Sequence, residues 1–496
     1  MAEEHHHDPT FYRSPRDAAA GPPEKLAYVA AYSHPADHPA DRPDAIAVVD
    51  TDPGSASYAS VVGFTELPHV GDELHHFGWN ACSSALCPTG SHTHGGRRYL
   101  VVPGIRSSRV YILDTQPDPS SPQVVKVLDA EELGKRASYS RPHTVHCGPG
   151  YLYMSCLGGA NGNDGPGGVA LLDHSTFEVL GQFEADRGDQ YLAYDVWWHI
   201  NHDVLVTSEW ATPSMIEDGV VPELLLGRKY GHRLHFWDMN TRRHTQTVDL
   251  GDQHQMALEL RPAHDPAKQY GFVGVVVSVE DLSASVWVWH REAGRWAATK
   301  VISIPAEPAP AEQLPPLLQG FGAVPPLITD IDLSVDDRFL YVSCWGTGEM
   351  KQYDVTDPFH PRETGSVRIG GIVGRAPHPA RPAAGRRPAD GRGQPRRQAG
   401  VLHQLALRIL GRAVLPRRRR RVDDQARRRP RRRDRLGREV LPRGRCVPRP
   451  PRAPGPARGR RRLQRLVLLL MTPPRPTACC RMAGARGGPG GGAAAA

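Results

Sequence analysis

Short β-like segments recur along most of this chain, and this repetition restricts its fold more than any other feature. Between Ala27 and Val373 the repeating unit is an apolar strand, a turn, a second strand often ending in Asp, and a third strand. RRYLVVPGIRSSRVYILDT and DRFLYVSCWGTGEMKQYDVTDP are two examples, rich in β-branched and aromatic residues and broken by Gly, Asp, Asn and Pro. Groups of strands repeated every several tens of residues are typical of propeller blades.

The repeats predict an all-β, β-propeller-like domain of the seven-bladed type that is incomplete at its C-terminal end. A pair of β-sandwiches is the alternative, but it does not explain why similar strands open successive units. Few segments have helical periodicity, apart from a short helix expected near AEELGKRA. We expect an N-terminal extension over residues 1–24, the propeller over residues 25–373 and a basic tail over residues 374–496.

The chain consists of two parts with opposite charge. The first 370 residues hold 27 basic and 48 acidic residues and all of the Trp, Tyr and Phe, whereas residues 371–496 hold 34 Arg, no Lys and five acidic residues. The acidic, aromatic body is not expected to bind nucleic acid. Its five scattered Cys do not suggest a disulfide framework, the polar start lacks the apolar core of a secretory signal, and LVLLLM is too short to span a membrane. We therefore expect a cytoplasmic protein.

The Arg-rich tail has two interpretations. Clustered Arg, as in LPRRRRRVDDQARRRPRRR, neutralises phosphates and would bind nucleic acid. Arg, Ala, Gly and Pro also have GC-rich codons, and a shift of one nucleotide allows residues 399–418 to be read as RVFFTNSLYGSWDEQFYPDG. We favour a frameshift between about Gly374 and Arg387. The tail as written should be disordered because it lacks core-forming residues; resequencing this part of the gene tests the frameshift.

Histidines occur in four groups within the predicted propeller. The groups are His75 and His76 in DELHHFGWNACSS, His143 and His146 in RPHTVHC, His199 and His202 in WWHINHD, and His264 in RPAHDP. Each group alone is better explained by packing or by turns. Neutral imidazole binds Cu, Zn, Ni and Fe, however, and the inner strands of a propeller would bring distant groups to one channel. Together the groups predict a metal site, in which His143 and His146 can both take part only if the backbone turns between them.

No other motif competes with this metal site. The sequence has no HExxH, no paired CxxC and no glycine-rich phosphate loop that opens a helix. GGANGNDGPGG lies between two expected strands and is predicted to be a loop. Cys147 follows His146 and is either a soft metal ligand or a buried thiol.

Several of these stretches resemble one known family. DELHHFGWNACSS, HTVHC, LAYDVWW, TSEWATP and PLITDIDLSVDDRFLYVSCWGTGEMKQYDVTDP resemble the selenium-binding protein / methanethiol oxidase family, over about Thr10 to Val373. The shifted string from residues 399–418 resembles the C-terminal end of that family. The resemblance implies a propeller-like fold and copper-dependent oxidation of methanethiol with O₂ and water to formaldehyde, hydrogen sulfide and hydrogen peroxide. The implied partners are this small thiol and O₂; the oligomeric state is left open.

The resemblance also implies site residues. The expected copper ligands match family histidines and are His75, His76, His143 and His146, with His202 and His264 as weaker candidates. The catalytic candidates, near in sequence to the first two ligands, are Asp72, Glu73 and Cys82. Copper is the cofactor that the resemblance implies. Ala59 stands where some members carry a selenium-linked Cys, so selenium binding is not expected. The family's late histidine falls in the shifted frame, so this chain would lack it. A non-enzymatic propeller that binds selenium, thiols or a protein partner is the alternative function.

Overall fold

The computed structural model describes residues 21–31, 42–81 and 97–374, apart from residues 117, 200, 201 and 369. The predicted basic tail therefore lies outside the described residues, except for Gly374, and so do Cys82 and most of the predicted N-terminal extension. Among the described residues, no helix has both the length and the apolar character needed to cross a bilayer.

Most of the described residues form antiparallel sheets whose strands follow one another in chain order. Sheet 1 has three strands, β1 (Leu26–Ala31), β2 (Ala45–Asp50) and β3 (Val61–Glu66). Sheet 2 consists of β4 (Gly78–Trp79), β5 (Tyr99–Pro103), β6 (Val110–Asp114) and β7 (Gln123–Leu128), and sheet 3 of β8 (Tyr139–Cys147), β9 (Leu152–Gly159), β10 (Gly168–Leu172) and β11 (Val179–Gln182).

The next three sheets also have four strands each. Sheet 4 consists of β12 (Val196–His199), β13 (Val204–Ser208), β14 (Arg233–Asp238) and β15 (Arg243–Asp249). Sheet 5 consists of β16 (His254–Pro262), β17 (Tyr270–Ser278), β18 (Ala284–Glu292) and β19 (Arg295–Ile304), and sheet 6 of β22 (Ile328–Leu333), β23 (Phe339–Cys344), β24 (Glu349–Asp354) and β25 (Arg362–Arg368). Two short strands, β20 (Glu307–Pro308) and β21 (Ala323–Val324), pair with each other outside these sheets.

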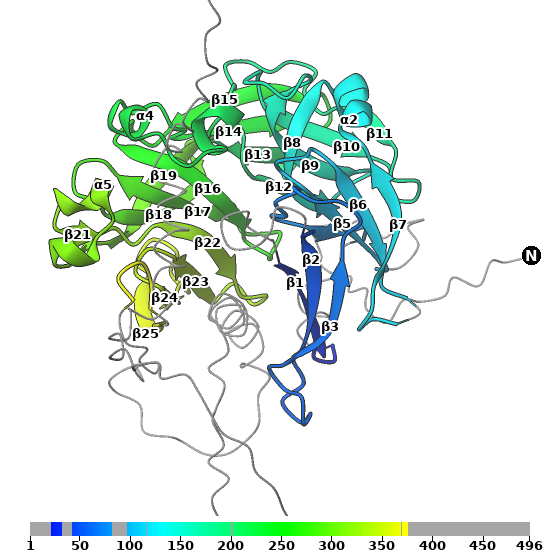
Figure 1. Ribbon diagram of the computed structural model, residues 1–496. Helices are drawn as coiled ribbons and strands as arrows, with labels where there is room; N and C mark the ends of the chain where they lie inside the picture. The colour runs from blue at the N-terminus through cyan, green and yellow to red at the C-terminus, as the bar shows by residue number, and fades with distance from the viewer. Residues whose placement is uncertain are drawn as a thin grey trace, which may run out of the picture.

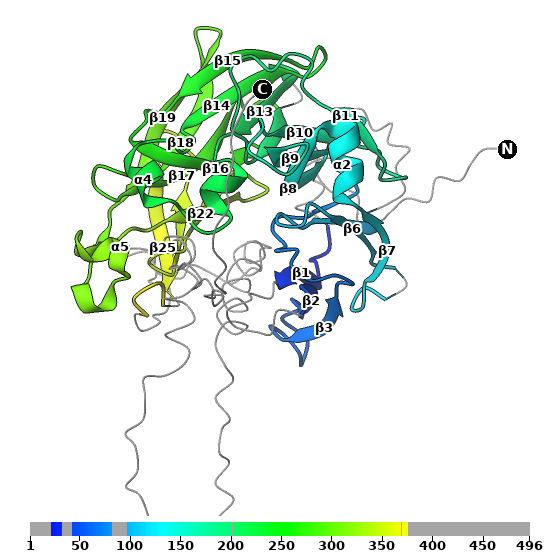
Figure 2. The same ribbon diagram turned by 45° about the horizontal axis from the view of Figure 1, so that its top comes forward.

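The six sheets follow one another around an arc, from sheet 1 in blue to sheet 6 in yellow-green (Figure 1). The first strands of neighbouring sheets contact each other, β4 with β8, β8 with β12, β12 with β16 and β16 with β22. These strands therefore line the inside of the arc, and Figure 2 shows β8, β16 and β22 there from a second direction. The all-β propeller prediction is confirmed. Where we expected a seven-bladed type, the described residues account for six sheets.

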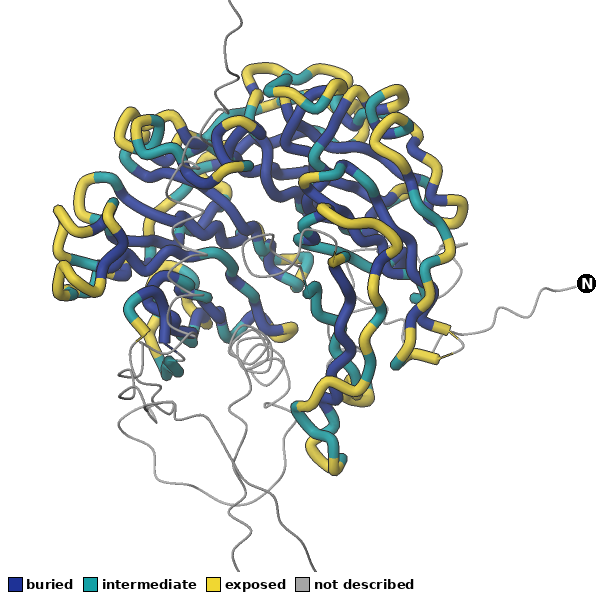
Figure 3. The backbone as a smooth tube through the Cα atoms, in the orientation of Figure 1, coloured by how far each residue is buried: buried dark blue, intermediate teal, exposed yellow. Residues whose placement is uncertain are grey.

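The core of the protein is divided into layers between neighbouring sheets. Phe272 of sheet 5 packs with Ile331 of sheet 6, and Val206 of sheet 4 packs with Val273 of sheet 5. Figure 3 shows the result: most strands of the sheets are buried, and the exposed segments are largely turns and outer strands such as β3. Burial on both faces explains why strands inside the sheets read as nearly continuous apolar runs, for example YGFVGVVVS in β17, the second strand of sheet 5.

Short helices cover two parts of the sheets. The predicted helix in AEELGKRA is confirmed as α2 (Ala130–Ala137), which packs on β8 and β11 (Figure 2). Acidic side chains in its first turn and basic ones in its last complement the helix dipole. The other helices are shorter: α3 (Pro213–Ile216), α4 (Pro222–Leu226), α5 (Pro316–Gln319) and the 3₁₀ turn Ala311–Gln313. Together they contribute Met215, Ile216 and Leu318 to a further apolar cluster with Met256 of β16.

Three inner strands contain a β-bulge. The register of β8 shifts between Pro142 and Val145, and those of β16 and β22 shift at equivalent places early in the strand. A residue with positive φ lies at or just before each bulge: Arg141 (φ 57°), Met256 (φ 67°) and Leu327 (φ 54°). A bulge changes the alternation of side chains along a strand. It therefore decides which side chains of these strands face the channel.

Candidate metal and catalytic site

The predicted histidines His75 and His143 meet on the inside of the arc. His75 lies just before β4 and His143 lies on β8, and the distance between His75 Nδ1 and His143 Nε2 is 3.2 Å. His75 Nε2 is 3.5 Å from Glu73 Oε1, and a carboxylate can only accept, so Nε2 carries the proton and Nδ1 keeps its lone pair. His143 Nδ1 is 3.0 Å from Thr144 Oγ1. When the Thr144 hydroxyl accepts a hydrogen bond from His143 Nδ1, the His143 Nε2 atom carries no proton and its lone pair faces His75.

This pair fits a bound metal ion. Two nitrogens 3.2 Å apart can each lie about 2.0 Å from one ion, the usual bond length from a first-row metal to imidazole. The contacts of Glu73 and Thr144 with the outer nitrogens are of the kind that orients metal-bound histidines. The donor set is imidazole, which suits copper. His75 and His143 are therefore the residues of the described chain that would hold copper, with His76 beside them.

His76 is the third imidazole of this group. Its ring centre lies 4.8 Å from that of His143, and its Nε2 is 3.2 Å from Glu259 Oε1 and 3.4 Å from the Tyr194 hydroxyl. Burial lowers the pKa of His76 to about 3 and lowers the pKa of His143 well below its usual value. Both rings are therefore neutral near pH 7, and neutral imidazole is the form that binds metal ions.

The bulge in β8 settles how the two histidines of HTVHC lie. In a regular strand, residues three apart point to opposite faces. The register shift between Pro142 and Val145 lies within this segment, and the backbone therefore turns between His143 and His146. This is the turn that the sequence analysis required. His146 nevertheless has different neighbours from His143: its Nε2 is 3.5 Å from Asp195 Oδ1, and its ring packs against Trp197 with centres 4.0 Å apart and planes tilted by 39°.

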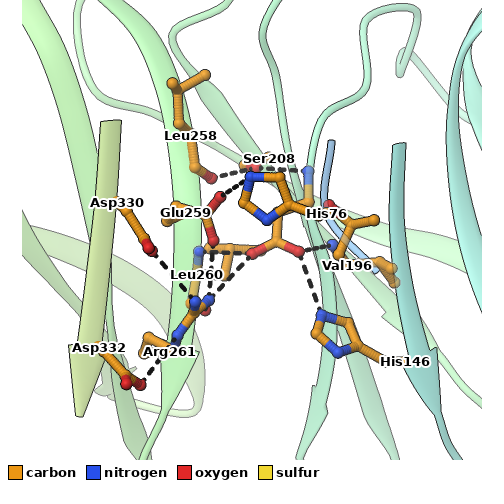
Figure 4. Close-up of polar contacts among 12 residues, drawn as sticks. His76, His146, Val196, Ser208, Leu258, Glu259, Leu260, Arg261, Asp330 and Asp332 are labelled. Carbon is orange, nitrogen blue, oxygen red and sulfur yellow. Dashed lines mark hydrogen bonds and ion pairs between the residues drawn. The ribbon is translucent and has the colours of Figure 1, made fainter. Parts of the chain in front are cut away.

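A buried network of charged residues connects His146 with His76 (Figure 4). Arg261 of β16 lies at its centre, with a guanidinium nitrogen 2.9 Å from Glu259 Oε2 and 3.6 Å from Asp195 Oδ2. Asp195 also accepts hydrogen bonds from the backbone N–H groups of Val196 and Leu260, both 2.8 Å long. The network thus joins strands of sheets 4 and 5 to the histidines of sheets 2 and 3.

Sheet 6 closes the network with two more carboxylates, Asp330 and Asp332 of β22. Their oxygens lie 3.3 Å and 3.6 Å from the Arg261 guanidinium. Burial raises the pKa of Glu259 well above its usual value, and the negative charge of Asp195 reinforces the shift. Burial would raise the pKa of Asp195 as well, but His146 and Arg261 lower it. The two carboxyl groups therefore differ: the pKa of Asp195 is lowered and the pKa of Glu259 is raised.

The structure gives different surroundings to the predicted catalytic residues Asp72 and Glu73. Asp72 is buried and accepts hydrogen bonds from the Tyr111 hydroxyl (2.7 Å) and from Arg109 (3.1 Å). Its carboxylate therefore supports the turn before β4 and does not contact the histidines. Burial would raise the pKa of Glu73, but His75 and Arg106 outweigh it and lower the pKa to about 2, which makes Glu73 a weak base that orients His75.

The weaker metal candidates His202 and His264 lie elsewhere. The ring of His202 packs against His199, with centres 4.5 Å apart, after β12. His264 Nδ1 is 2.9 Å from Asp337 Oδ1, in the turn between β16 and β17. Neither makes a contact with the His75–His143 pair in the described structure, where His202 follows β12 and His264 follows β16. Cys82, the remaining catalytic candidate, lies outside the described residues.

Four residues of this site were not found from the sequence: Tyr194, Asp195, Glu259 and Arg261. Our search was guided by metal-ligating side chains, so it passed over these residues even where they stand in segments that it quoted, as in LAYDVWW and RPAHDP. One signal was present. Glu259 and Arg261 interrupt the apolar inner strand HQMALELRP, and a charged pair inside such a strand must find partners when it is buried.

Comparison with known proteins identifies a family whose model spans all of the residues that the structure describes. The family model of the 56 kDa selenium binding protein (SBP56) matches residues 5–394. The methanethiol oxidase of Danio rerio is 38% identical over 364 residues, which cover 73% of this chain and 76% of that protein. Selenium-binding protein 2 of Mus musculus is 38% identical over 366 residues, covering 73% of each chain.

A solved structure agrees with these relatives. The crystal structure of a hypothetical selenium-binding protein from Sulfolobus tokodaii is 55% identical, with a TM-score of 0.71, and covers 75% of this chain and 81% of that one. Residues 5–394, which the family model matches, include the sheets that carry the histidines and the charged network. The chain therefore belongs to the 56 kDa selenium-binding protein family.

Proposed function

We propose that this protein is a methanethiol oxidase that uses copper held by His75 and His143, with His76 beside them. It converts methanethiol, O₂ and water into formaldehyde, hydrogen sulfide and hydrogen peroxide. The observation that carries the proposal is the 3.2 Å separation of His75 Nδ1 and His143 Nε2, with the outer nitrogens held by Glu73 and Thr144. Relatives from Danio rerio and Rattus norvegicus that are named methanethiol oxidase support the same reaction.

A small apolar cavity beside the histidines suits the substrate. Its volume is about 120 Å³, and Trp210, Met256, Leu258 and Trp345 are among the side chains that line it. Trp210 separates this cavity from the metal site, since its ring centre is 6.1 Å from that of His143 and 5.4 Å from that of Tyr194. Methanethiol and O₂ are both small and weakly polar, so an apolar approach of this size favours them over larger polar thiols.

The chain supplies the proton-transfer groups of the reaction. A bound copper ion would provide a soft partner for the thiolate sulfur and a redox centre that passes electrons to O₂. Glu259 is the best candidate for the base that takes a proton from the methyl carbon, because a carboxylate with a raised pKa is a stronger base than an exposed one. Tyr194 donates a hydrogen bond of 3.1 Å to Glu259 Oε1 and orients that oxygen. Arg261 compensates the negative charge of the ionised form.

The test is a sulfide-release assay on the purified full-length chain after loading with copper. We expect copper-dependent production of hydrogen sulfide, formaldehyde and hydrogen peroxide in equal amounts from methanethiol. The same assay on the form with the restored reading frame controls for the family histidine that the present frame lacks. A chain that binds no copper and releases no sulfide in either form would reject the proposal.

The non-enzymatic alternative, a carrier of selenium or thiols, has less support among the described residues. A carrier of this kind needs an accessible thiolate. Cys156 and Cys344 are buried free thiols, and burial raises the pKa of both, that of Cys344 to about 12. Ala59, in place of the selenium-linked Cys of some family members, adds to this argument. Buried free thiols also agree with a cytoplasmic location, which we retain as part of the proposal.

A further inference from the structure

A second group of metal-ligating side chains lies outside the charged network, on the outer strands of sheet 4. It consists of Asp189, His235 and His244, whose ligand atoms all lie within 4.8 Å of one another. We propose that these three side chains bind a divalent transition-metal ion, with zinc as the best match, and that the ion clamps the linker of residues 183–195 to sheet 4. This site is independent of the proposed oxidase activity.

The distances match a metal site. His235 Nδ1 and His244 Nε2 are 3.1 Å apart, and Asp189 Oδ1 lies 3.7 Å from the first and 3.6 Å from the second. A triangle with these sides has its corners about 2.0 Å from its centre, which is the bond length from zinc to nitrogen or carboxylate oxygen. Thr247 Oγ1 lies 2.6 Å from Asp189 Oδ1, 3.4 Å from His235 Nδ1 and 3.3 Å from His244 Nε2. It therefore occupies a fourth corner around the same point.

A β-bulge brings the ligands of sheet 4 to one face. His235 of β14 pairs with Thr247 of β15, whereas Trp237 pairs with His244, so β15 contains one extra residue between these pairs. In a regular strand, His244 and Thr247 would point to opposite faces because they are three residues apart. The bulge turns both towards His235.

Glu209 orients His235 and fixes which of its ring nitrogens carries the proton. His235 is fully buried, and its Nε2 is 3.0 Å from Glu209 Oε1. A carboxylate accepts this hydrogen bond, so the proton lies on Nε2 and the lone pair of Nδ1 faces His244 and Asp189. The arrangement of carboxylate, histidine and metal ion recurs in zinc proteins, where the outer carboxylate fixes the ring.

The linker is held against His244 at three points. The backbone N–H of His244 donates to the Asp186 carbonyl over 2.9 Å, and Asp186 forms a parallel bridge with Arg243. Gly188 has a φ of 58°, and a Cβ at this position would lie 2.4 Å from His244 Nδ1. The linker can therefore pass close to the ring only with glycine there, and it carries Asp189 across the ligand nitrogens. The Asp189 side chain is 55% exposed, so the site is open to an ion from solvent.

Zinc titration of the full-length chain after chelator treatment tests the proposal, with bound zinc measured by equilibrium dialysis and elemental analysis. We expect Asp189→Asn, an exposed and isosteric change that should not affect folding, to weaken binding of one zinc equivalent at least tenfold. His244→Gln should remove that equivalent. His232→Gln is the matched control, since it removes an imidazole of the same sheet that pairs with Asp249 instead. It should leave the zinc content unchanged.

A crystal soaked in zinc gives the second readout. An anomalous peak between His235 and His244 is expected, together with a rise in the melting temperature on zinc addition that His244→Gln abolishes. Equal zinc binding by the parent and His244→Gln, or zinc peaks only at other residues, would overturn the site. The oxidase assay on copper-loaded His244→Gln separates the two proposals, because its activity should equal that of the parent.

Discussion

His75 Nδ1 and His143 Nε2 lie 3.2 Å apart although 68 residues separate them in the chain. The turn before β4 holds one ring and the bulged strand β8 holds the other, so the contact exists only when sheets 2 and 3 pack together. Glu73 and Thr144 hold the outer nitrogens. This contact is the structural basis of the proposed copper site, and each element around it can be tested.

Replacing His143 with Gln should remove copper and activity together. The variant loses one of two facing nitrogens, so we expect kcat/KM to fall by about 100-fold or more and the copper content to fall with it. Copper analysis and sulfide release measure both. His202→Gln and His264→Gln serve as controls because those rings lie away from the pair. Full copper content in His143→Gln would contradict the site.

Replacing Glu73 with Gln should weaken copper binding without abolishing it. An amide no longer accepts a charge-assisted hydrogen bond from His75 Nε2, and loss of such an outer contact typically costs about 10–100-fold in metal affinity. Competition with a copper chelator measures the change. Glu66→Gln, on exposed strand β3, is the control. If Glu73 were the catalytic base instead, activity would be lost even at saturating copper.

Replacing Arg261 with Met should destabilise the propeller. The change removes the positive charge that balances Asp195, Glu259 and two further carboxylates. Removing one partner of a buried ion pair costs about 3–5 kcal/mol. Denaturant unfolding followed by Trp fluorescence measures the loss. Arg362→Met, which breaks an exposed pair with Asp354, should cost about 1 kcal/mol or less. Equal effects of the two variants would disprove the stabilising role of the network.

Asp337 should make stability depend on acid pH. Burial would raise its pKa, but hydrogen bonds from His264 and from the backbone of His264 and Asp265 lower it. A carboxylate with a lowered folded-state pKa contributes stability above its unfolded value, near about 4, and loses it as the pH falls through the folded-state pKa. Asp337→Asn should thus lose about 1–3 kcal/mol at pH 7 and be less sensitive to acid. Melting temperatures of both proteins from pH 7 to pH 3 should converge; parallel curves would contradict this.

Restoring the reading frame between codons 374 and 387 should strengthen the copper site. The shifted frame would encode the late histidine of the family, which the present frame lacks. We expect higher copper affinity and faster sulfide release from the restored chain than from the present one. Genomic sequencing of the same codons is the independent check, and a confirmed present frame would remove the basis for this expectation.

Much of the architecture was predictable from local patterns. Alternation along strands is set by backbone geometry, and turn residues are visible in the sequence. The repeated sheets and the helix of AEELGKRA were therefore found from the sequence, with α2 at the expected residues. The histidine groups were also visible, because imidazole is rare enough for its clusters to be noticed.

Which residues form each site could not be predicted from local sequence patterns in the same way. Asp195 and Arg261 stand in the quoted segments LAYDVWW and RPAHDP, but nothing local gives them a role there. They matter because inner strands of sheets 4, 5 and 6 converge. His264, which the sequence suggested as a metal ligand, instead pairs with Asp337 and connects two sheets. The Asp189, His235 and His244 group depends on one extra residue in β15, which cannot be read from strand periodicity.

The sequence by itself determined that this chain builds successive small sheets with histidines near their inner strands, because strand formation and turns depend on neighbouring residues. Only the tertiary structure decided which imidazoles share a centre and which buried carboxyl group has a raised pKa. Those outcomes depend on bulges, on the packing of one sheet against the next and on burial of charge, all of which arise from contacts between residues far apart in the chain.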